Sequence, residues 1–207
     1  MSGALTIVPA NEASWDDIQT VFGMRGTAVI CQCQRFKLRP KESFKWSPVE
    51  ERAMRLRAQT NAGHPNADTT SGLVAYLEGE PVAWCAVEPR TAYTGLLRVY
   101  RVPWVGRSED KTDDSVWAVT CFFVRAGYRR RGFTYELARA ATDFARQRGA
   151  RALEAYPMIV QPGQEIIWDE VLVGTRSIFA AAGFTEVSHP TPRRVVMRID
   201  FEGAQDR

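Results

Sequence analysis

The fold is decided by the stretch Val124-Arg125-Ala126-Gly127-Tyr128-Arg129-Arg130-Arg131-Gly132-Phe133-Thr134. The apolar run Val116–Val124 leads into it, and apolar residues recur at helical spacing in Thr134–Arg148 after it. We therefore expect a strand, a basic turn that contains glycine, and a helix, in that order. Such a turn brings backbone N–H groups, the positive end of a helix dipole and three arginines to one point. This arrangement predicts an anion site, for which phosphate is the commonest ligand.

The residues after this helix predict a crossover between parallel strands. Gly149 stands where the helix should end, because glycine readily adopts the left-handed conformation of a helix cap. Arg151–Tyr156 has the pattern of a second strand, and Pro157 ends it. Two strands joined by a helix are usually parallel neighbours in one sheet. We therefore expect Val116–Val124 and Arg151–Tyr156 to lie side by side.

The remaining elements follow from local patterns. Ser14 predicts the cap of a helix over Trp15–Phe22, and Ser47 predicts the cap of another helix with Pro48 as its first residue. Residues 107–115 are polar and predict a solvated loop. The other predicted elements are the strand Ala4–Pro9, a hairpin of Leu73–Glu78 and Val82–Glu88 around Gly79-Glu80-Pro81, a short helix Thr175–Ala182, and the closing strands Phe184–Ser188 and Arg193–Ile199. The fold class is α/β of the α+β type, with a mixed sheet.

The composition limits the class of protein. No Pro/Gly/Ser-rich linker divides the 207 residues, so we expect one domain over residues 1–207. The 27 basic and 24 acidic residues leave a net charge of +3, too little to predict nucleic-acid binding. The pattern of a leader peptide or a membrane span is missing, and scattered cysteines indicate a reducing compartment, so a cytoplasmic, soluble protein is expected. Cys31 and Cys33 are half of a zinc motif without the other half, so no metal is expected.

The basic turn does not match two common nucleotide-binding motifs. A P-loop needs Gly-Lys-Ser/Thr, and a dinucleotide motif needs glycines that are missing here. Arg129-Arg130-Arg131-Gly132-Phe133-Thr134 instead resembles the Arg/Gln-x-x-Gly-x-Gly/Ala signature of the GNAT superfamily of acyl-CoA-dependent N-acyltransferases. Thr134 departs from the small residue that is usual at the last position. Ser177–Phe184 resembles the short family helix that ends in Gly-Phe, and the resemblance covers residues 72–200.

This resemblance implies a single-domain GNAT-like fold with a central mixed, largely antiparallel sheet flanked by helices. It implies that the two parallel strands splay apart and that the pantetheine arm of acetyl-CoA, the expected cosubstrate, lies in the gap. The alternative is that the three arginines only lie in solvent at the start of the helix. This explains them poorly, because that end of the helix dipole repels cations. The implied cofactor-binding residues are Phe122, Phe123, Val124, Arg129, Arg130, Arg131, Gly132, Phe133 and Thr134.

The catalytic groups are harder to assign. The family usually places a tyrosine acid four residues before the glycine of the Gly-Phe pair, and Phe179 holds that position here. Alternate residues of a strand share a face, so Glu154 and Tyr156 lie together on the second parallel strand. Our hypothesis is that Glu154, through water, accepts the proton of the amine and that Tyr156 donates to the departing thiolate. The alternative is that Glu154 pairs with an arginine such as Arg151 or Arg193 and that Tyr156 is packed under a loop.

The expected function is the transfer of acetyl from acetyl-CoA to a primary amine of an unidentified small molecule or peptide, by direct attack. Glu88, Glu165, Asp169 and Glu170 could attract a cationic amine, although solvated acidic loops are commoner. Cys121 is expected to be core, since no histidine is placed to activate it. The second hypothesis is an acyl-CoA-binding protein with little or no turnover. The expected partners are acyl-CoA and an amine acceptor, with no nucleic acid and no membrane. Because family members often dimerise, a homodimer is also expected.

Overall fold

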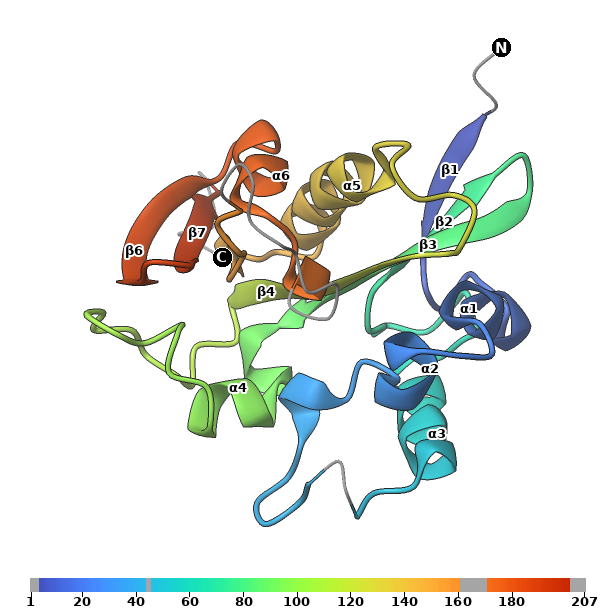
Figure 1. Cartoon of the computed structure of the whole chain (residues 1–207), viewed down its shortest axis with the longest axis horizontal. Coiled ribbons are helices and arrows are strands. Elements are labelled where there is room, and N and C mark those ends of the chain that lie inside the picture. The colour runs from blue at the N-terminus through green and yellow to red at the C-terminus, as the bar shows by residue number, and fades with distance from the viewer. Residues whose placement is uncertain (1–3, 44–45, 161–170, 202–207) are drawn as a thin grey trace.

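Within the described part of the chain, seven strands form one sheet at the centre of the molecule (Figure 1). The computed structural model describes residues 4–43, 46–160 and 171–201. The strands are β1 (Leu5–Pro9), β2 (Leu73–Leu77), β3 (Glu80–Pro89), β4 (Val116–Val124), β5 (Ala152–Ala155), β6 (Thr185–Thr191) and β7 (Arg194–Asp200). They lie in the order β1-β2-β3-β4-β5-β7-β6. Only β4 and β5 are parallel, so the predicted mixed, largely antiparallel sheet is confirmed.

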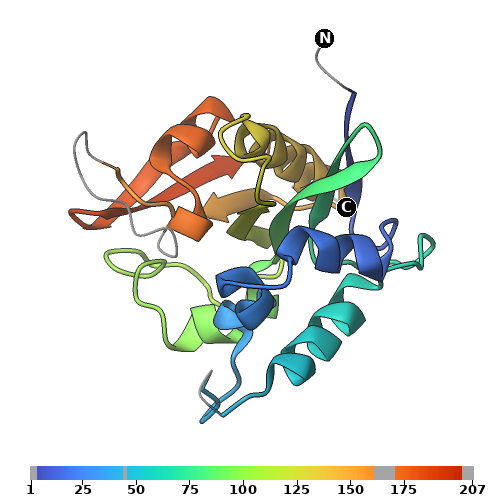
Figure 2. The same ribbon diagram turned by 45° about the vertical axis from the view of Figure 1, so that its right-hand side comes forward.

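Helices cover both faces of this sheet, as Figures 1 and 2 show from two directions. The helices are α1 (Trp15–Phe22), α2 (Thr27–Cys31), α3 (Val49–Thr60), α4 (Thr94–Arg98), α5 (Phe133–Gln147) and α6 (Arg176–Ala181). Short 3-10 helices span Arg35–Lys37, Arg90–Ala92 and Val171–Val173. Strand β3 shows how the two faces arise, because its side chains alternate. Cys85 and Val87 belong to the core under α5, whereas Trp84 and Ala86 belong to the core under α1 and α3.

The predicted crossover is confirmed, with small shifts at its ends. β4 has the predicted bounds, α5 begins at Phe133, and Gly149 follows the helix with a φ of 79°. The hairpin is also confirmed, but its predicted turn is wrong. The chain reverses at Glu78 and Gly79, whose φ angles of 53° and 83° suit a two-residue hairpin turn. Pro81, which has no N–H, lies inside β3 beside an irregular pairing with β2.

One of the two predicted serine caps is confirmed and the other is wrong. Ser14 Oγ accepts a hydrogen bond from the backbone N–H of Asp17 at 3.0 Å, at the start of α1. At α3 the cap position is held by Pro48, and the helix begins at Val49. No side chain caps α3, and Ser47 Oγ is buried without a hydrogen-bond partner among the described residues. Pro48 has a ψ of 150°, which is extended and not helical, so it stands before the helix and leaves Ser47 one residue outside the cap position.

We expect Ser14→Ala and Ser47→Ala to differ in stability, although the sequence context is similar. Ser14→Ala removes a capping bond and should lower the free energy of unfolding by about 1 kcal/mol. Ser47→Ala removes a buried hydroxyl that lacks a partner, so it should be neutral or stabilising. Urea denaturation of both variants measures the difference. A larger loss for Ser47→Ala than for Ser14→Ala would contradict this assignment of the caps.

Candidate active site

Strand β4 separates from its parallel neighbour half-way along its length. The pairing between β4 and β5 ends at Val119 and Ala155. On the other side, β3 stays paired with β4 as far as Val124. The pairing between β3 and β4 skips Thr120, which has no partner on β3 and therefore forms a β-bulge. Beyond the bulge, β4 continues without β5 along one edge, which is the splayed arrangement expected from the sequence.

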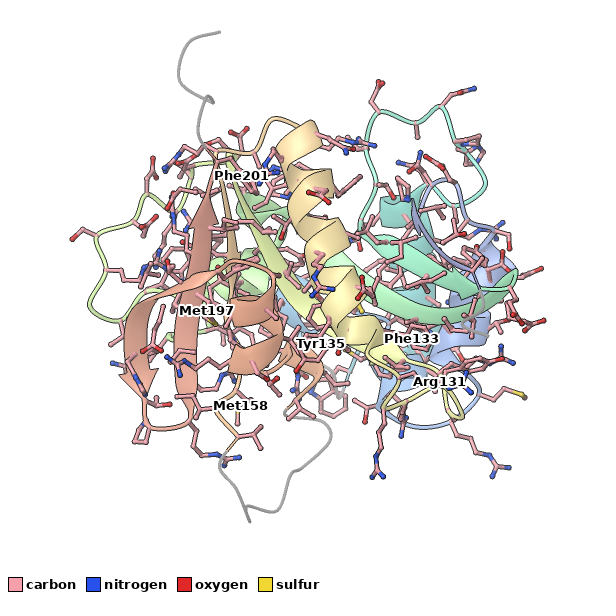
Figure 3. All side chains as sticks on the ribbon, turned by 90° about the horizontal axis from the view of Figure 1, so that it is seen from above. Arg131, Phe133, Tyr135, Met158, Met197 and Phe201 are labelled. Carbon is pink, nitrogen blue, oxygen red and sulfur yellow. The ribbon has the colours of Figure 1, made fainter. Side chains whose placement is uncertain are left out.

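A groove of about 910 Å³ runs along this part of β4. It extends over the basic turn to the start of α5, and its far wall is made by the end of α1 and the start of α2. Figure 3 shows Arg131 and Phe133 at the start of α5, Tyr135 further along, and Met158 beyond them on the β7 side of the molecule. The residues that the sequence predicted to bind the cofactor all line this groove: Phe122, Phe123, Val124, Arg129, Arg130, Arg131, Gly132, Phe133 and Thr134.

The start of α5 has the properties of an anion site. Gly132 occupies the cap position with a φ of 84°, and no side chain in the described parts of the chain caps the helix. Arg130 also has a positive φ of 63°, so the basic turn is held in a conformation that most residues avoid. The first N–H groups of a helix lack intrahelical acceptors. The arginine side chains of the turn are exposed, and Arg131 packs against the ring of Tyr128 at 5.5 Å. These groups together favour a negatively charged ligand.

Phe179, at the position of the usual family acid, is a core residue. Its side chain is 0% exposed, and its ring centroid lies 5.6 Å from that of Phe122 and 5.2 Å from that of Phe184. A Cβ atom on Gly174 would come within 2.7 Å of the Phe179 ring, so the packing is tight. This position therefore contributes packing and no proton donor.

Glu154 lies in a buried cluster of charges. Its side chain is 0% exposed and accepts hydrogen bonds from Arg198 at 2.9 Å, from Arg90 at 3.2 Å and from Arg107. The hydroxyl of Tyr156 donates to the same carboxylate at 3.0 Å. Burial raises the pKa of Glu154, but the contacts with Arg107, Arg90 and Tyr156 together outweigh it, so the net pKa is lowered. A carboxylate held in this way accepts a proton poorly.

These contacts correct two expectations. Glu154 does pair with arginines, but Arg151, which was expected to be one of them, pairs with Asp113 at 2.5 Å instead. The loop at 107–115 was expected to be solvated, yet the side chain of Arg107 is only 6% exposed and lies against Glu154. Glu154 also lines neither cavity of the site. Its surroundings favour the structural alternative over the role of a base. Tyr156 does share a face with Glu154, as strand parity predicted.

A second cavity, of about 650 Å³, adjoins the groove. Thr27 and Leu172 line both spaces, so the two meet there. Along β4 the wall of the second cavity includes Cys121, and the wall of the groove begins at Phe122. Sequence reasoning placed Tyr156 near the site but missed most of this wall. The missed residues include Arg35, Phe36, Leu96, Tyr100, Val102, Met158, Arg193 and Arg194.

The sequence also suggested acidic residues and a thiol for the site, and the described ones, Glu88 and Cys121, are engaged in other contacts. Glu88 is buried and ion-paired with Lys37. Glu165, Asp169 and Glu170 lie outside the described residues. The pKa of the Cys121 thiol is raised well above its usual value by a hydrogen bond with Cys33 and by burial. Among the residues that the structure describes, no group of Cys, His, Asp and Glu is arranged to hold a metal ion.

Comparison with known proteins identifies the family of this chain. The model of the acetyltransferase (GNAT) family matches residues 35–163. No protein of curated function matches the sequence. A GCN5-related N-acetyltransferase from Kribbella flavida is 18% identical, covers 96% of this chain and 98% of its own, and has a TM-score of 0.52. A ribosomal-protein-alanine N-acetyltransferase from Brucella melitensis is 15% identical, covers 95% and 99%, and has a TM-score of 0.52. A Salmonella typhimurium protein solved with its cofactor acetyl-CoA is 14% identical, covers 97% and 95%, and has a TM-score of 0.53.

The chain therefore belongs to the GNAT acetyltransferase family, and its fold is that of the solved N-acetyltransferases. Enzymes of this family use acetyl-CoA as cosubstrate, and the family makes N-acetyl transfer the general activity. In the described residues no helix is both long and apolar enough to cross a membrane.

Proposed function

We propose that this protein transfers acetyl from acetyl-CoA to a primary amine of a small molecule or peptide by direct attack of the amine on the thioester. One observation carries the proposal: the groove runs from the anion site at α5 along β4 to Phe122 and meets a second cavity, which Cys121 and the bulge residue Thr120 line, at Thr27 and Leu172. The pyrophosphate would bind at the N–H groups around Gly132, with the arginines of the basic turn around it. The pantetheine arm would follow Phe122–Val124. We call the second cavity the acceptor cavity.

Direct attack is favoured over an acyl-cysteine intermediate. Cys121 lines the acceptor cavity, but its raised pKa leaves almost no thiolate at neutral pH. Burial likewise raises the pKa of Cys31 to about 11. In direct attack the amine must be neutral, and the oxyanion of the tetrahedral intermediate must be stabilised where it forms. Tyr156 stays our candidate acid because it lines the acceptor cavity, but its hydroxyl proton is donated to Glu154, so it would have to turn that proton from Glu154 to the departing thiolate.

The buried Phe179 does not by itself exclude turnover. The leaving thiolate of coenzyme A corresponds to a thiol with a solution pKa of about 8.5, so it can depart without a strong acid. A protein that binds acyl-CoA without transfer is the second candidate, and Phe179 is the observation that favours it.

Amine-dependent release of coenzyme A tests the proposed function. We expect calorimetric binding of coenzyme A, thiol release from acetyl-CoA that depends on an added amine, and no acetyl adduct on the protein by mass spectrometry. Absence of coenzyme binding would overturn the proposal. Binding without thiol release across a broad amine panel would identify the binding protein instead. An acetyl adduct would identify a covalent route.

Three further parts of the proposal follow from the sequence and stay predictions. The single domain over residues 1–207 is consistent with one continuous sheet in the described residues. A cytoplasmic location is consistent with four free cysteines. A homodimer is consistent with the edge strands β1 and β6, which have unpaired outer edges in the described sheet.

A further inference from the structure

We infer that Lys37 is a positioning residue, whose buried ion pair with Glu88 holds one wall of the acceptor cavity in place. We call residues 33–38 the wall segment, because Cys33, Arg35 and Phe36 line that cavity. Lys37 itself lines neither cavity and acts through these neighbours. The inference rests on the function proposed above, since it takes this cavity to hold the amine.

The ammonium group of Lys37 is buried and all of its hydrogen bonds are made. Its side chain is only 5% exposed. Nζ donates to Ser71 Oγ at 2.9 Å, to Gln59 Oε1 at 3.1 Å and to Glu88 Oε1. An ammonium group has three N–H donors, so each donor has one acceptor here. The acceptors come from α3, from the residues just before β2 and from β3, so Lys37 ties the wall segment to three separate parts of the fold.

This ion pair fixes a position more than it adds stability. Two charges that leave water lose most of what their attraction returns, so apolar residues of similar size are often as stable. Burial raises the pKa of Glu88 in spite of the charge and the hydrogen bond of Lys37, so desolvation outweighs the attraction for this carboxyl. The bonds of Lys37 are directional, however, and three of them together hold its ammonium group at one point.

A second set of contacts joins the backbone of the wall segment to α4. Thr94 Oγ1 donates to the backbone oxygens of Lys37 and Leu38, each at 3.3 Å. Gly95 packs so closely that a Cβ atom there would come within 2.9 Å of the backbone oxygen of Phe36. The wall segment is thus held through its backbone by α4 and through one side chain by Glu88 and the other two acceptors.

The ring of Phe36 shows why this position matters for the acceptor. It lies next to Lys37 in the chain, and its centroid is 4.6 Å from that of Tyr100, which also lines the acceptor cavity. A shift of the wall segment would therefore change the shape of the cavity, and a misplacement of about 1 Å is enough to impair a bound reactant. Residues 33–38 do not line the groove, so coenzyme A should bind as before.

Hydrogen exchange of the full chain tests whether Lys37 holds the wall segment. Lys37→Met removes the three donors and keeps an unbranched side chain. The backbone N–H of Gln34 bonds to Cys31 and that of Lys37 to Gln34, each at 2.9 Å, so both amides report on the segment. We expect exchange at residues 34 and 37 to rise at least about tenfold, and exchange in α5 to stay within about twofold of wild type.

Lys111→Met is the matched control for this measurement. Lys111 is exposed, and its Nζ donates to the backbone oxygen of Leu97 at 3.2 Å. Its replacement should leave exchange in the wall segment unchanged.

Kinetics separate positioning from catalysis, with the amine that gives the fastest thiol release in the panel as acceptor. Lys37→Met should raise KM for this amine at least about fivefold, keep kcat within about threefold and leave the Kd of coenzyme A unchanged. Lys37→Met/Glu88→Gln also removes the charge left unpaired, so it should recover most of the lost melting temperature and still show the raised KM. Gly95→Ala pushes on the Phe36 backbone without removing a charge and should raise KM in the same way.

Three results would overturn the inference while leaving N-acetyl transfer intact: unchanged exchange at residues 34 and 37 in Lys37→Met, a wild-type KM in the double variant, or a lowered kcat with an unchanged KM. A wild-type KM in the double variant would show that the pair acts through stability alone. Exchange needs no amine, so it decides whether Lys37 holds the wall segment even if no amine is turned over. Loss of coenzyme binding in the wild-type protein would instead overturn the proposed function.

Discussion

Glu154→Gln should lower the free energy of unfolding by about 3–5 kcal/mol, since it leaves buried arginines without their counter-charge. The carboxylate is 0% exposed and binds Arg90, Arg107 and Arg198. Its pKa is lowered in the folded protein, so this stabilisation is fully present above the unfolded pKa of glutamate, about 4.3. It is lost as the pH falls through the lower folded value. Urea denaturation should thus give equal differences from wild type at pH 7 and pH 5.5, and a smaller one at pH 3.5.

The same variant separates a structural role from a catalytic one. We expect Glu154→Gln to keep kcat within about threefold at temperatures where it is folded. Glu136→Gln is the matched control, because Glu136 forms an exposed pair with Arg139 at 2.7 Å and should lose less than about 1 kcal/mol. Unchanged stability together with a kcat reduced a hundredfold would contradict this view and restore Glu154 as the base.

The alternation of side chains along a strand placed Tyr156 beside Glu154. It could not reveal the arginine cluster, because those arginines lie far from Glu154 along the chain. Glu154 and Tyr156 are two residues apart, so the strand period alone places them together. Arg90, Arg107 and Arg198 are 64, 47 and 44 positions away from Glu154. Polar patterns of loops do not show which cation will be buried, and the run at 107–115 therefore suggested only solvent. Long-range electrostatic contacts of this kind need the folded structure.

The anion site could be predicted because it is local. The strand, the basic turn and the helix are consecutive, and Gly132 marks the turn in the sequence itself. The bulge at Thr120 could not be predicted, because it depends on which β3 residue pairs with β4. The acceptor cavity could not be predicted either. Its wall combines Arg35 with Arg194, which only the fold brings together.

Gly132→Asp should weaken the binding of coenzyme A at least about a hundredfold while leaving the protein folded. Asp tolerates a positive φ and is a favoured residue at helix caps, and a Cβ atom at Gly132 meets no atom within 4 Å. The helix itself should therefore accept the change. The added carboxylate would face the pyrophosphate, and two unit charges 4 Å apart near a protein surface repel by about 4 kcal/mol. A smaller repulsion would already give the expected effect, since a hundredfold loss of affinity corresponds to about 2.7 kcal/mol.

Gly132→Asn isolates the charge, because it has nearly the same shape and is also a good cap. We expect Gly132→Asn to retain much more of the coenzyme affinity than Gly132→Asp, and the difference between the two to shrink as salt is added. Calorimetric titration with coenzyme A at two ionic strengths measures both effects. If the role of Gly132 were only to start α5, the aspartate would suit the helix dipole and coenzyme binding would stay within about threefold of wild type. That result would show that the pyrophosphate does not bind at the basic turn, because a phosphate beside the new carboxylate would lower the affinity for coenzyme A.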